Sequence, residues 1–420
     1  MTTTEIAVGG LLRLATAGSV DDGKSTLVGR LLHDTSAVMP DQLEAVRRVS
    51  RDKGLAQADL ALLTDGLRAE REQGITIDVA YRYFATAKRR FVLADTPGHV
   101  QYTRNMVTGA STAQLAVILV DARLGFVEQT GRHTVVSALL RVPHVALAVN
   151  KMDLVDHDEA RFAEIAEEFT EYARRLGVPD VVAIPISALC GDNVVEPSPN
   201  MSWYAGPTLL EHLETVDTDG VPEATRFPVQ YVVRAADFRG YAGQLSSGML
   251  RVGDEVAVLP AGHHTRITGI ELGGAPVQEA FAPQSAVVRL ADAVDVARGD
   301  MIAPVATQPI PADRLLLVGC QLASRPIRVG DRVLLRHTTR TVRAVVEGID
   351  ERLDVHSLRT DNALDTLYTN EIALVSVRTA EPVAVDPYEA NRHCGAVLLI
   401  DEASGDTLTA GMVGVPTWWP

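Results

Sequence analysis

The sequence predicts an α/β domain with a mostly parallel sheet and helices on both faces, followed by two small antiparallel β-barrel domains. Apolar strands alternate with helices as far as about residue 216. A polar, breaker-rich link follows at 217–225. From Phe227 onward, short alternating segments separated by Gly-Asp, Gly-Gly and Arg-Gly-Asp turns replace the helices. We therefore expect an α/β domain over 1–216 and β-barrels over 225–306 and 312–418.

The first strand, predicted over 11–17, leads into a loop with a phosphate-binding pattern. The loop fits Gly, four residues, Gly-Lys-Ser/Thr, and a helix is predicted over 26–32. Glycines let backbone N–H groups close around phosphates at a helix N-terminus, whose dipole favours negative charge. Lys24 can reach the β- and γ-phosphates, and the Ser25 hydroxyl can ligate Mg²⁺. The alternative is a glycine-rich turn before an ordinary helix. The phosphate-binding residues predicted in this loop are Gly18, Ser19, Val20, Asp21, Asp22, Gly23, Lys24, Ser25 and Thr26.

A second block follows the short apolar strand predicted over 90–94. Asp95 at its end can hold Mg²⁺ through water, and Gly98, three residues on, can offer its N–H to the γ-phosphate. The residues predicted to contact the phosphates here are Asp95, Thr96, Pro97 and Gly98.

Two further blocks point to guanine as the base. Asp153, after the strand predicted over 145–149, can accept hydrogen bonds from N1–H and the exocyclic amine of guanine. Adenine presents the wrong edge and would leave a buried charge unpaired. After the strand predicted over 181–186, a backbone N–H would lie near the guanine oxygen. The predicted guanine-binding residues are Asn150, Lys151, Met152, Asp153, Ser187, Ala188 and Leu189.

The order of the four blocks carries more weight than any one of them. Asn-Lys-x-Asp alone is also compatible with an ordinary polar turn. All four, however, lie at the C-terminal ends of predicted strands, the edge at which open α/β sheets bind ligands. The first domain is therefore predicted to be an α/β P-loop GTPase domain that binds GTP and Mg²⁺.

The remaining elements complete the predicted architecture. A helix is expected from about 158 to 176, because Phe162, Ile165, Phe169 and Tyr172 share one face. Three prolines between 304 and 311 mark the break between the barrels. The echo of Arg-Val-Gly-Asp-x-Val at 251–256 and 328–333 predicts a strand, a tight turn and a strand in each barrel.

Composition excludes several classes of protein. A net charge of −15 disfavours a general nucleic-acid-binding surface, although a local basic patch is compatible with it. No apolar run approaches the ~20 residues that span a bilayer, and 1–10 lacks the pattern of a signal peptide. The three cysteines, Cys190, Cys320 and Cys394, lie far apart without metal-ligand spacing. We expect a cytoplasmic protein that binds neither nucleic acid nor membranes.

Nearly the whole chain resembles the translational GTPase family, and within it the family of large, GTP-binding subunits of bacterial sulfate adenylyltransferase (ATP sulfurylase). The segments 60–84, 95–110 and 236–245 carry the resemblance. Glu-Arg-Glu-x-Gly-Ile-Thr-Ile is shared with elongation factors. By contrast, 78–84 (Asp-Val-Ala-Tyr-Arg-Tyr-Phe) and 237–243 (Asp-Phe-Arg-Gly-Tyr-Ala-Gly) are particular to the sulfate-activating branch.

The resemblance implies roles for two further residues. Thr76 matches the first-switch threonine that closes on Mg²⁺ and the γ-phosphate, which adds it to the metal-binding residues Ser25 and Asp95 (through water). His99 matches the catalytic histidine that orients the attacking water. From chemistry alone, His99 could instead satisfy a backbone carbonyl. Val100, where the branch has an acidic residue, and Cys190, where Glu is frequent, depart from the pattern.

The resemblance also implies a divided activity in sulfate assimilation and cysteine biosynthesis. A smaller catalytic subunit handles ATP and sulfate and forms adenylyl sulfate and pyrophosphate. GTP hydrolysis in the present subunit supplies free energy. No second phosphate loop follows the second barrel, so we expect the fused adenylyl-sulfate kinase of some relatives to be absent. The alternatives are a tRNA-delivering elongation-type GTPase and a regulatory GTPase with another protein partner.

Overall fold

The computed structural model describes residues 9–52, 58–63, 78–99, 103–178, 180–218, 223–235, 238–362 and 364–420. The chain divides into two compact units. The first comprises Met1–Asp219 with Val355–Ser357, and the second comprises Gly220–Asp354 with Leu358–Pro420. The predicted fold class, an α/β domain followed by two antiparallel barrels, is confirmed by the sheet topology. The limits of the three domains stay predictions.

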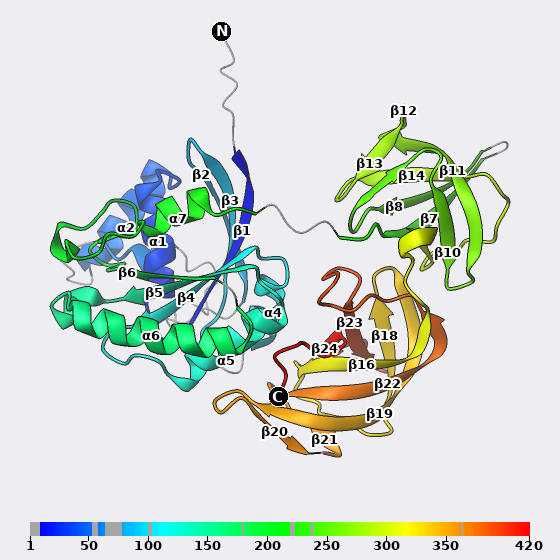
Figure 1. The fold of residues 1–420 in the computed structure, drawn as a ribbon. Coiled ribbons are helices and arrows are strands. Elements are labelled where there is room, and N and C mark those ends of the chain that lie inside the picture. The colour runs from blue at the N-terminus through cyan, green and yellow to red at the C-terminus, as the bar shows by residue number, and fades with distance from the viewer. Residues whose placement is uncertain are drawn as a thin grey trace, which may run out of the picture. The chain divides into compact units, whose positions relative to one another are not determined.

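Six strands form the sheet of the first unit, in the order β2-β3-β1-β4-β5-β6 (Figure 1). All neighbouring strands are parallel except β2 and β3. Every residue of β4 is buried, as expected for a parallel strand covered on both faces. The strands are β1 (Gly9–Gly18), β2 (Ala80–Ala85), β3 (Arg89–Asp95), β4 (Leu115–Asp121), β5 (His144–Asn150) and β6 (Val181–Pro185).

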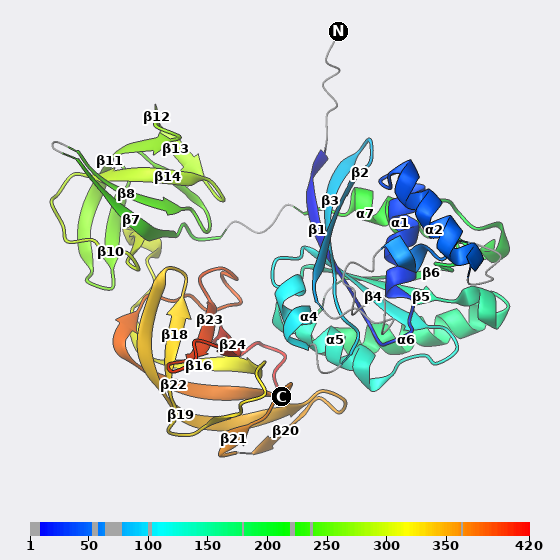
Figure 2. The same cartoon turned by 180° about the vertical axis from the view of Figure 1, so that it is seen from behind.

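Helices cover both faces of this sheet, as Figures 1 and 2 show. Leu27 of α1 and Leu213 of α7 share one apolar core with Leu14 of β1. α4, α5 and α6 lie on the opposite face. The helices are α1 (Lys24–Asp34), α2 (Pro40–Asp52), α4 (Thr103–Ala110), α5 (Glu128–Leu139), α6 (Glu159–Arg175) and α7 (Leu209–Thr215), with 3₁₀ turns η1 (Leu60–Leu63), η3 (Met152–Val155) and η4 (Pro199–Met201).

Helix α6 shows how closely local signals set the element boundaries. The Asp158 carboxylate caps its first turn by accepting a hydrogen bond from the Ala160 N–H at 2.9 Å. Ile165 and Phe169 are buried on the predicted apolar face. Gly177 follows with a φ of 69°, a left-handed conformation that suits glycine beyond a helix C-terminus.

The first barrel closes through six strands in the order β10-β15-β7-β8-β14-β11, because β10 also pairs with β11. Its core includes Phe227, Tyr241 and Val288. The strands of this region are β7 (Phe227–Ala235), β8 (Phe238–Gln244), β9 (Met249–Arg251), β10 (Glu255–Leu259), β11 (His263–Leu272), β12 (Ala275–Val277), β13 (Glu279–Phe281), β14 (Ser285–Leu290) and β15 (Met301–Pro304), followed by the turn η5 (Val305–Thr307).

The second barrel repeats this plan in the order β18-β23-β24-β16-β22-β19, and β18 pairs with β19 to close it. Leu317, Val346 and Leu399 lie in its core. The strands are β16 (Ala312–Gln321), β17 (Ile327–Arg328), β18 (Arg332–His337), β19 (Arg340–Asp354), β20 (Arg359–Asn362), β21 (Thr366–Leu367), β22 (Ile372–Val383), β23 (Ala396–Asp401) and β24 (Thr407–Val413).

The sequence echo in the two barrels corresponds to one repeated turn, which confirms that prediction. Asp254 accepts a hydrogen bond from the Arg251 N–H at 2.8 Å, and Asp331 accepts the equivalent one from Arg328 at 3.0 Å. The glycine before each aspartate has a positive φ, which a side chain would strain. Within the described part of the chain, none of the helices has the length and apolar character to cross a membrane.

Candidate nucleotide site

The loop between β1 and α1 is built so that backbone closes tightly around its centre. Gly23 has a φ of 93°, and a Cβ there would collide with Nδ2 of Asn150. A Cβ on Gly18 would lie 2.9 Å from the carbonyl oxygen of Leu119. Glycine is therefore required at both ends of the loop, both for its conformation and for the close approach of neighbouring strands. The helix that follows starts at Lys24 and directs its N-terminal N–H groups toward the loop.

Lys24 lies buried beneath this loop. Its ammonium donates hydrogen bonds to the carbonyl oxygens of Gly18 at 2.8 Å and Ser19 at 2.6 Å. Burial lowers the pKa of Lys24, and the carboxylates of Asp22 and Asp95 oppose that shift. A cation held among carbonyl groups beside a helix N-terminus gives the loop a strongly anion-attracting centre.

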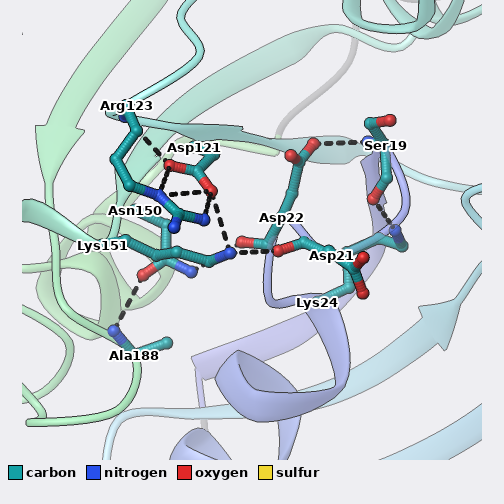
Figure 3. Close-up of polar contacts among 9 residues, drawn as sticks. All are labelled: Ser19, Asp21, Asp22, Lys24, Asp121, Arg123, Asn150, Lys151 and Ala188. Atoms are coloured by element: carbon teal, nitrogen blue, oxygen red, sulfur yellow. Dashed lines mark hydrogen bonds and ion pairs between the residues drawn. The ribbon is translucent and has the colours of Figure 1, made fainter. Parts of the chain in front are cut away.

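The carboxylate of Asp22 occupies the same loop. It accepts a hydrogen bond from the Ser19 N–H at 2.5 Å, and only 3% of the residue is exposed (Figure 3). Desolvation by burial raises its pKa to about 6, against the attraction of Lys24. Its backbone N–H donates to the Ser19 carbonyl, at 3.4 Å. The Asp22 side chain therefore fixes the conformation of the loop through its oxygen, although burial disfavours its charged form.

The loop after β3 packs directly against the loop after β1. Thr16 donates a hydrogen bond from Oγ1 to Asp95 at 2.9 Å, and Thr96 donates from Oγ1 to the Thr16 carbonyl at 2.5 Å. A Cβ on Gly98 would collide with the Lys24 ammonium and would lie 2.8 Å from the Gly18 carbonyl oxygen. Asp95 and Gly98 are thus brought to the same edge of the sheet as Lys24, as the sequence predicts, and Pro97 between them is buried.

Asn150, the last residue of β5, and Lys151 after it hold the phosphate loop from the other side. Asn150 donates from Nδ2 to the Asp22 carbonyl at 2.7 Å and accepts from the Ala188 N–H at 2.9 Å, as Figure 3 shows. One side chain therefore connects the predicted phosphate loop with the predicted base-side loop. Lys151 extends the connection by donating from Nζ to the carbonyl of Asp21.

Asp121 lies at the centre of a cation cluster that the sequence analysis did not identify. Its carboxylate pairs with Lys151 at 2.9 Å and with Arg123 at 2.6 Å. Burial acts to raise its pKa, but the hydrogen bonds from Arg123 and Lys151 dominate and lower it to about 2. The available signal was the apolar strand 115–120 ending in a carboxylate, the same pattern that identified Asp95.

The residues predicted to bind guanine differ in burial and in their hydrogen bonds. Oδ1 of Asp153 is buried and has no hydrogen-bond partner among the described residues. Met152 is fully buried, and its backbone N–H donates to the Ile186 carbonyl at 3.2 Å. Ser187 accepts at Oγ from the Cys190 N–H at 3.1 Å, and Leu189 is 53% exposed.

Side chains from helices α1 and α5 also form hydrogen bonds with the loops of the candidate site. Arg30 of α1 donates to the carbonyls of Ala188 at 3.2 Å and Leu189 at 2.5 Å, and nothing in the sequence analysis singled it out. Gln129 of α5 donates from Nε2 to the Gly98 carbonyl at 3.3 Å, and its Nε2 lies 3.0 Å from Nε2 of His133. Burial lowers the pKa of His133 to about 3, so the ring is neutral.

The remaining predicted residues are exposed, half-buried or outside the described residues. His99 is exposed at the bend after Gly98. Val20, Ser25 and Thr26 are half-buried in the loop and in the first turn of α1. Thr76 and Val100 lie outside the described residues.

Two family models match the chain. The elongation factor Tu GTP binding domain matches residues 10–222, and the GTP-eEF1A C-terminal domain-like family matches residues 318–414. The first match covers the whole candidate site. The chain contains a GTP-binding domain of the elongation-factor type.

Several curated relatives match over nearly the full chain. "Bifunctional enzyme CysN/CysC" of Mycobacterium tuberculosis is 55% identical over 96% of this chain and 67% of that protein. "Sulfate adenylyltransferase subunit 1" of Bacteroides fragilis is 48% identical over 96% of this chain and 86% of the relative. The protein of the same name from Salmonella arizonae is 48% identical over 97% and 86%.

Proposed function

The chain belongs to the sulfate adenylyltransferase subunit 1 family, and we propose that it is the GTP-hydrolysing subunit of that enzyme. GTP hydrolysis here drives the synthesis of adenylyl sulfate and pyrophosphate from ATP and sulfate in a partner catalytic subunit. The observation that carries the nucleotide part is the convergence of Lys24, Asp95 and Asp153 at one edge of the sheet, on loops tied together by Asn150.

Guanine recognition is assigned to Asp153. An unpartnered, buried carboxylate oxygen is costly unless a ligand supplies the donor. The N1–H and exocyclic amine of guanine supply two donors on one edge, whereas adenine does not. Asn150 and Lys151 hold the surrounding loops, and we assign Ser187, Ala188 and Leu189, tied to Asn150 through the Ala188 N–H, to the other side of the base.

Triphosphate binding requires Lys24 to exchange partners. In the structure its ammonium bonds to the loop's own carbonyls, and a phosphate offers a stronger, charged acceptor in their place. The N–H groups at the start of α1 and that of Gly98 complete the cradle.

Mg²⁺ fits the donor set at this edge. The Ser25 hydroxyl and the Asp95 carboxylate are hard oxygen donors, which Mg²⁺ prefers together with phosphate oxygens and water. Thr76 is assigned as a further ligand by its place in the sequence. The ion would neutralise charge on the β- and γ-phosphates. Thr16 holds the Asp95 carboxylate in place through the 2.9 Å hydrogen bond.

His99 is assigned to orient the attacking water. It follows Gly98, the residue assigned to donate its N–H to the γ-phosphate, and its side chain is exposed. Loss of the γ-phosphate would release Gly98 and Thr76, the switch through which the partner senses hydrolysis. We further propose a cytoplasmic location, in keeping with three widely spaced cysteines, and the three domains predicted from the sequence.

The test is reconstitution. The full chain is mixed with the small catalytic subunit from the same organism, and adenylyl sulfate formation from ATP and sulfate is measured with and without GTP. We expect GTP to stimulate synthesis with the unmodified chain but not with Lys24→Ala. Tight GTP-dependent binding of aminoacyl-tRNA, with no effect on synthesis, would instead indicate an elongation-type factor.

A further inference from the structure

One face of the sheet carries an exposed aromatic and basic patch that the nucleotide site does not use. It consists of Leu11, Arg13, Tyr81, Tyr83 and Arg90, here called the β2 patch. We propose that the β2 patch is the docking surface for the partner catalytic subunit, and that it receives an acidic, apolar-centred surface of that protein. This inference rests on the proposed function.

Strand register gathers these residues on one face. Tyr83 pairs with Val92, which pairs with Arg13, so the three form a row across β2, β3 and β1. The next row is Ala85, Arg90 and Leu11. Alternate residues, including Phe84, point into the core on the opposite face. The patch therefore draws its exposed residues from three strands on one face of the sheet, with the buried Val92 between Tyr83 and Arg13.

Three large side chains of the patch are exposed. Tyr83 is 72% exposed, Tyr81 43% and Leu11 40%. Figures 1 and 2 show β2 at the outer edge of the sheet. Tyrosines, with arginines beside them, are the residues that contribute most to binding energy when a partner buries them. A patch of this composition indicates an interface.

The positive charge of the two arginines in the β2 patch favours an acidic partner. Neither Arg13 nor Arg90 has an ion-pair partner among the residues that the structure describes. The chain as a whole carries a net charge of −15, so two unpaired arginines form a local exception to an acidic surface. A partner with carboxylates is repelled by most of the molecule and attracted here, which favours docking in one orientation.

Connection to the nucleotide site favours the catalytic subunit as the occupant. Tyr81 pairs with Ala94, and Ala80 pairs with Asp95, the residue assigned to Mg²⁺. In the sequence, β2 begins four residues after Thr76. A protein bound to the β2 patch thus contacts the strand that joins both γ-phosphate-sensing segments. Residues 80–84 of the same strand belong to the segment 78–84, which carries the resemblance to the sulfate-activating branch.

The test compares binding of the purified catalytic subunit to three forms of the full chain by calorimetry. Tyr81→Ser/Tyr83→Ser should weaken binding by about 30-fold or more, the effect of losing a central aromatic contact. The matched control Tyr368→Ser removes a 58% exposed tyrosine from the second barrel and should leave affinity unchanged. Basal GTP hydrolysis and Tm, measured without the partner, should be the same in all three proteins.

The arginines give an independent readout. Arg13→Gln/Arg90→Gln should flatten the dependence of affinity on salt concentration, because it removes the charges that attract the partner. Unchanged affinity of the tyrosine variant, while the unmodified chain binds and stimulates synthesis, would overturn the docking assignment alone. If the unmodified chain neither binds nor stimulates the catalytic subunit, the proposed function fails and the assignment with it. Dissociation of a dimer of this chain by the tyrosine variant, with partner affinity retained, would assign the patch to self-association instead.

Discussion

Asp22→Asn should stabilise the protein at neutral and alkaline pH. Burial raises the pKa of this carboxylate from 3.8 to about 6, so its charged form is less stable in the folded chain than in the unfolded chain. For an acid with a raised pKa, the destabilisation begins above pH 3.8 and is complete above pH 6. At about 1.36 kcal/mol per pKa unit, the cost reaches ~3 kcal/mol at pH 8 and about half of that at pH 5. Asparagine still offers an oxygen to the Ser19 N–H.

Calorimetry of the full chain measures this effect. For a domain of this size, ~3 kcal/mol corresponds to a rise in Tm of about 6 to 10 °C at pH 8, and the gain should shrink by about half at pH 5. Asp21→Asn is the matched control, because Asp21 is exposed in the same loop and should show no such gain. Equal Tm values for Asp22→Asn and the unmodified chain at pH 8, or a gain that is independent of pH, would refute the reasoning.

Four further variants test the nucleotide site. Asp153→Asn should weaken GTP binding and favour xanthosine triphosphate, since the amide donates to the altered base edge; unchanged GTP affinity in a titration would contradict its role. His99→Ala should bind GTP normally but hydrolyse it about 100-fold more slowly with the partner present, and wild-type turnover would mean that another group positions the water. Lys24→Ala should lose about 10-fold or more in GTP affinity, whereas equal retention would show that the loop is misassigned. Asp121→Asn should weaken GTP binding, because Lys151 loses its 2.9 Å partner; an unaltered dissociation rate would indicate that Lys151 needs no such support.

The sequence predicted the fold well because the fold depends on local patterns, and the same patterns bring the predicted Asp95, Gly98 and Lys24 to one edge of the sheet. Apolar strands ending in Asp95 and Asn150, and the glycines of the phosphate loop, have strong periodicity or strict steric requirements. The repeated turn at Asp254 and Asp331 was visible for the same reason.

Contacts between distant segments were the part that could not be predicted. Arg30 reaches the carbonyls of Ala188 and Leu189, 158 and 159 residues away, and no local pattern marks it. The ion pair between Asp121 and Lys151 likewise depends on the order of strands in the sheet. The exposure of Tyr83 follows from the edge position of β2, whereas alternation alone indicates only that one side of the strand is buried.

The central claim is that GTP hydrolysis drives adenylyl sulfate synthesis. It is tested most directly by the final amounts of product rather than by the rate of synthesis. The chain and the catalytic subunit are incubated with ATP, sulfate and GTP until adenylyl sulfate and pyrophosphate stop accumulating, and the plateau is compared with that reached without GTP. Coupled hydrolysis should raise the product of adenylyl sulfate and pyrophosphate above the GTP-free plateau, and His99→Ala should slow that rise. A faster approach to an unchanged plateau would contradict coupling and show that GTP acts only as an activator.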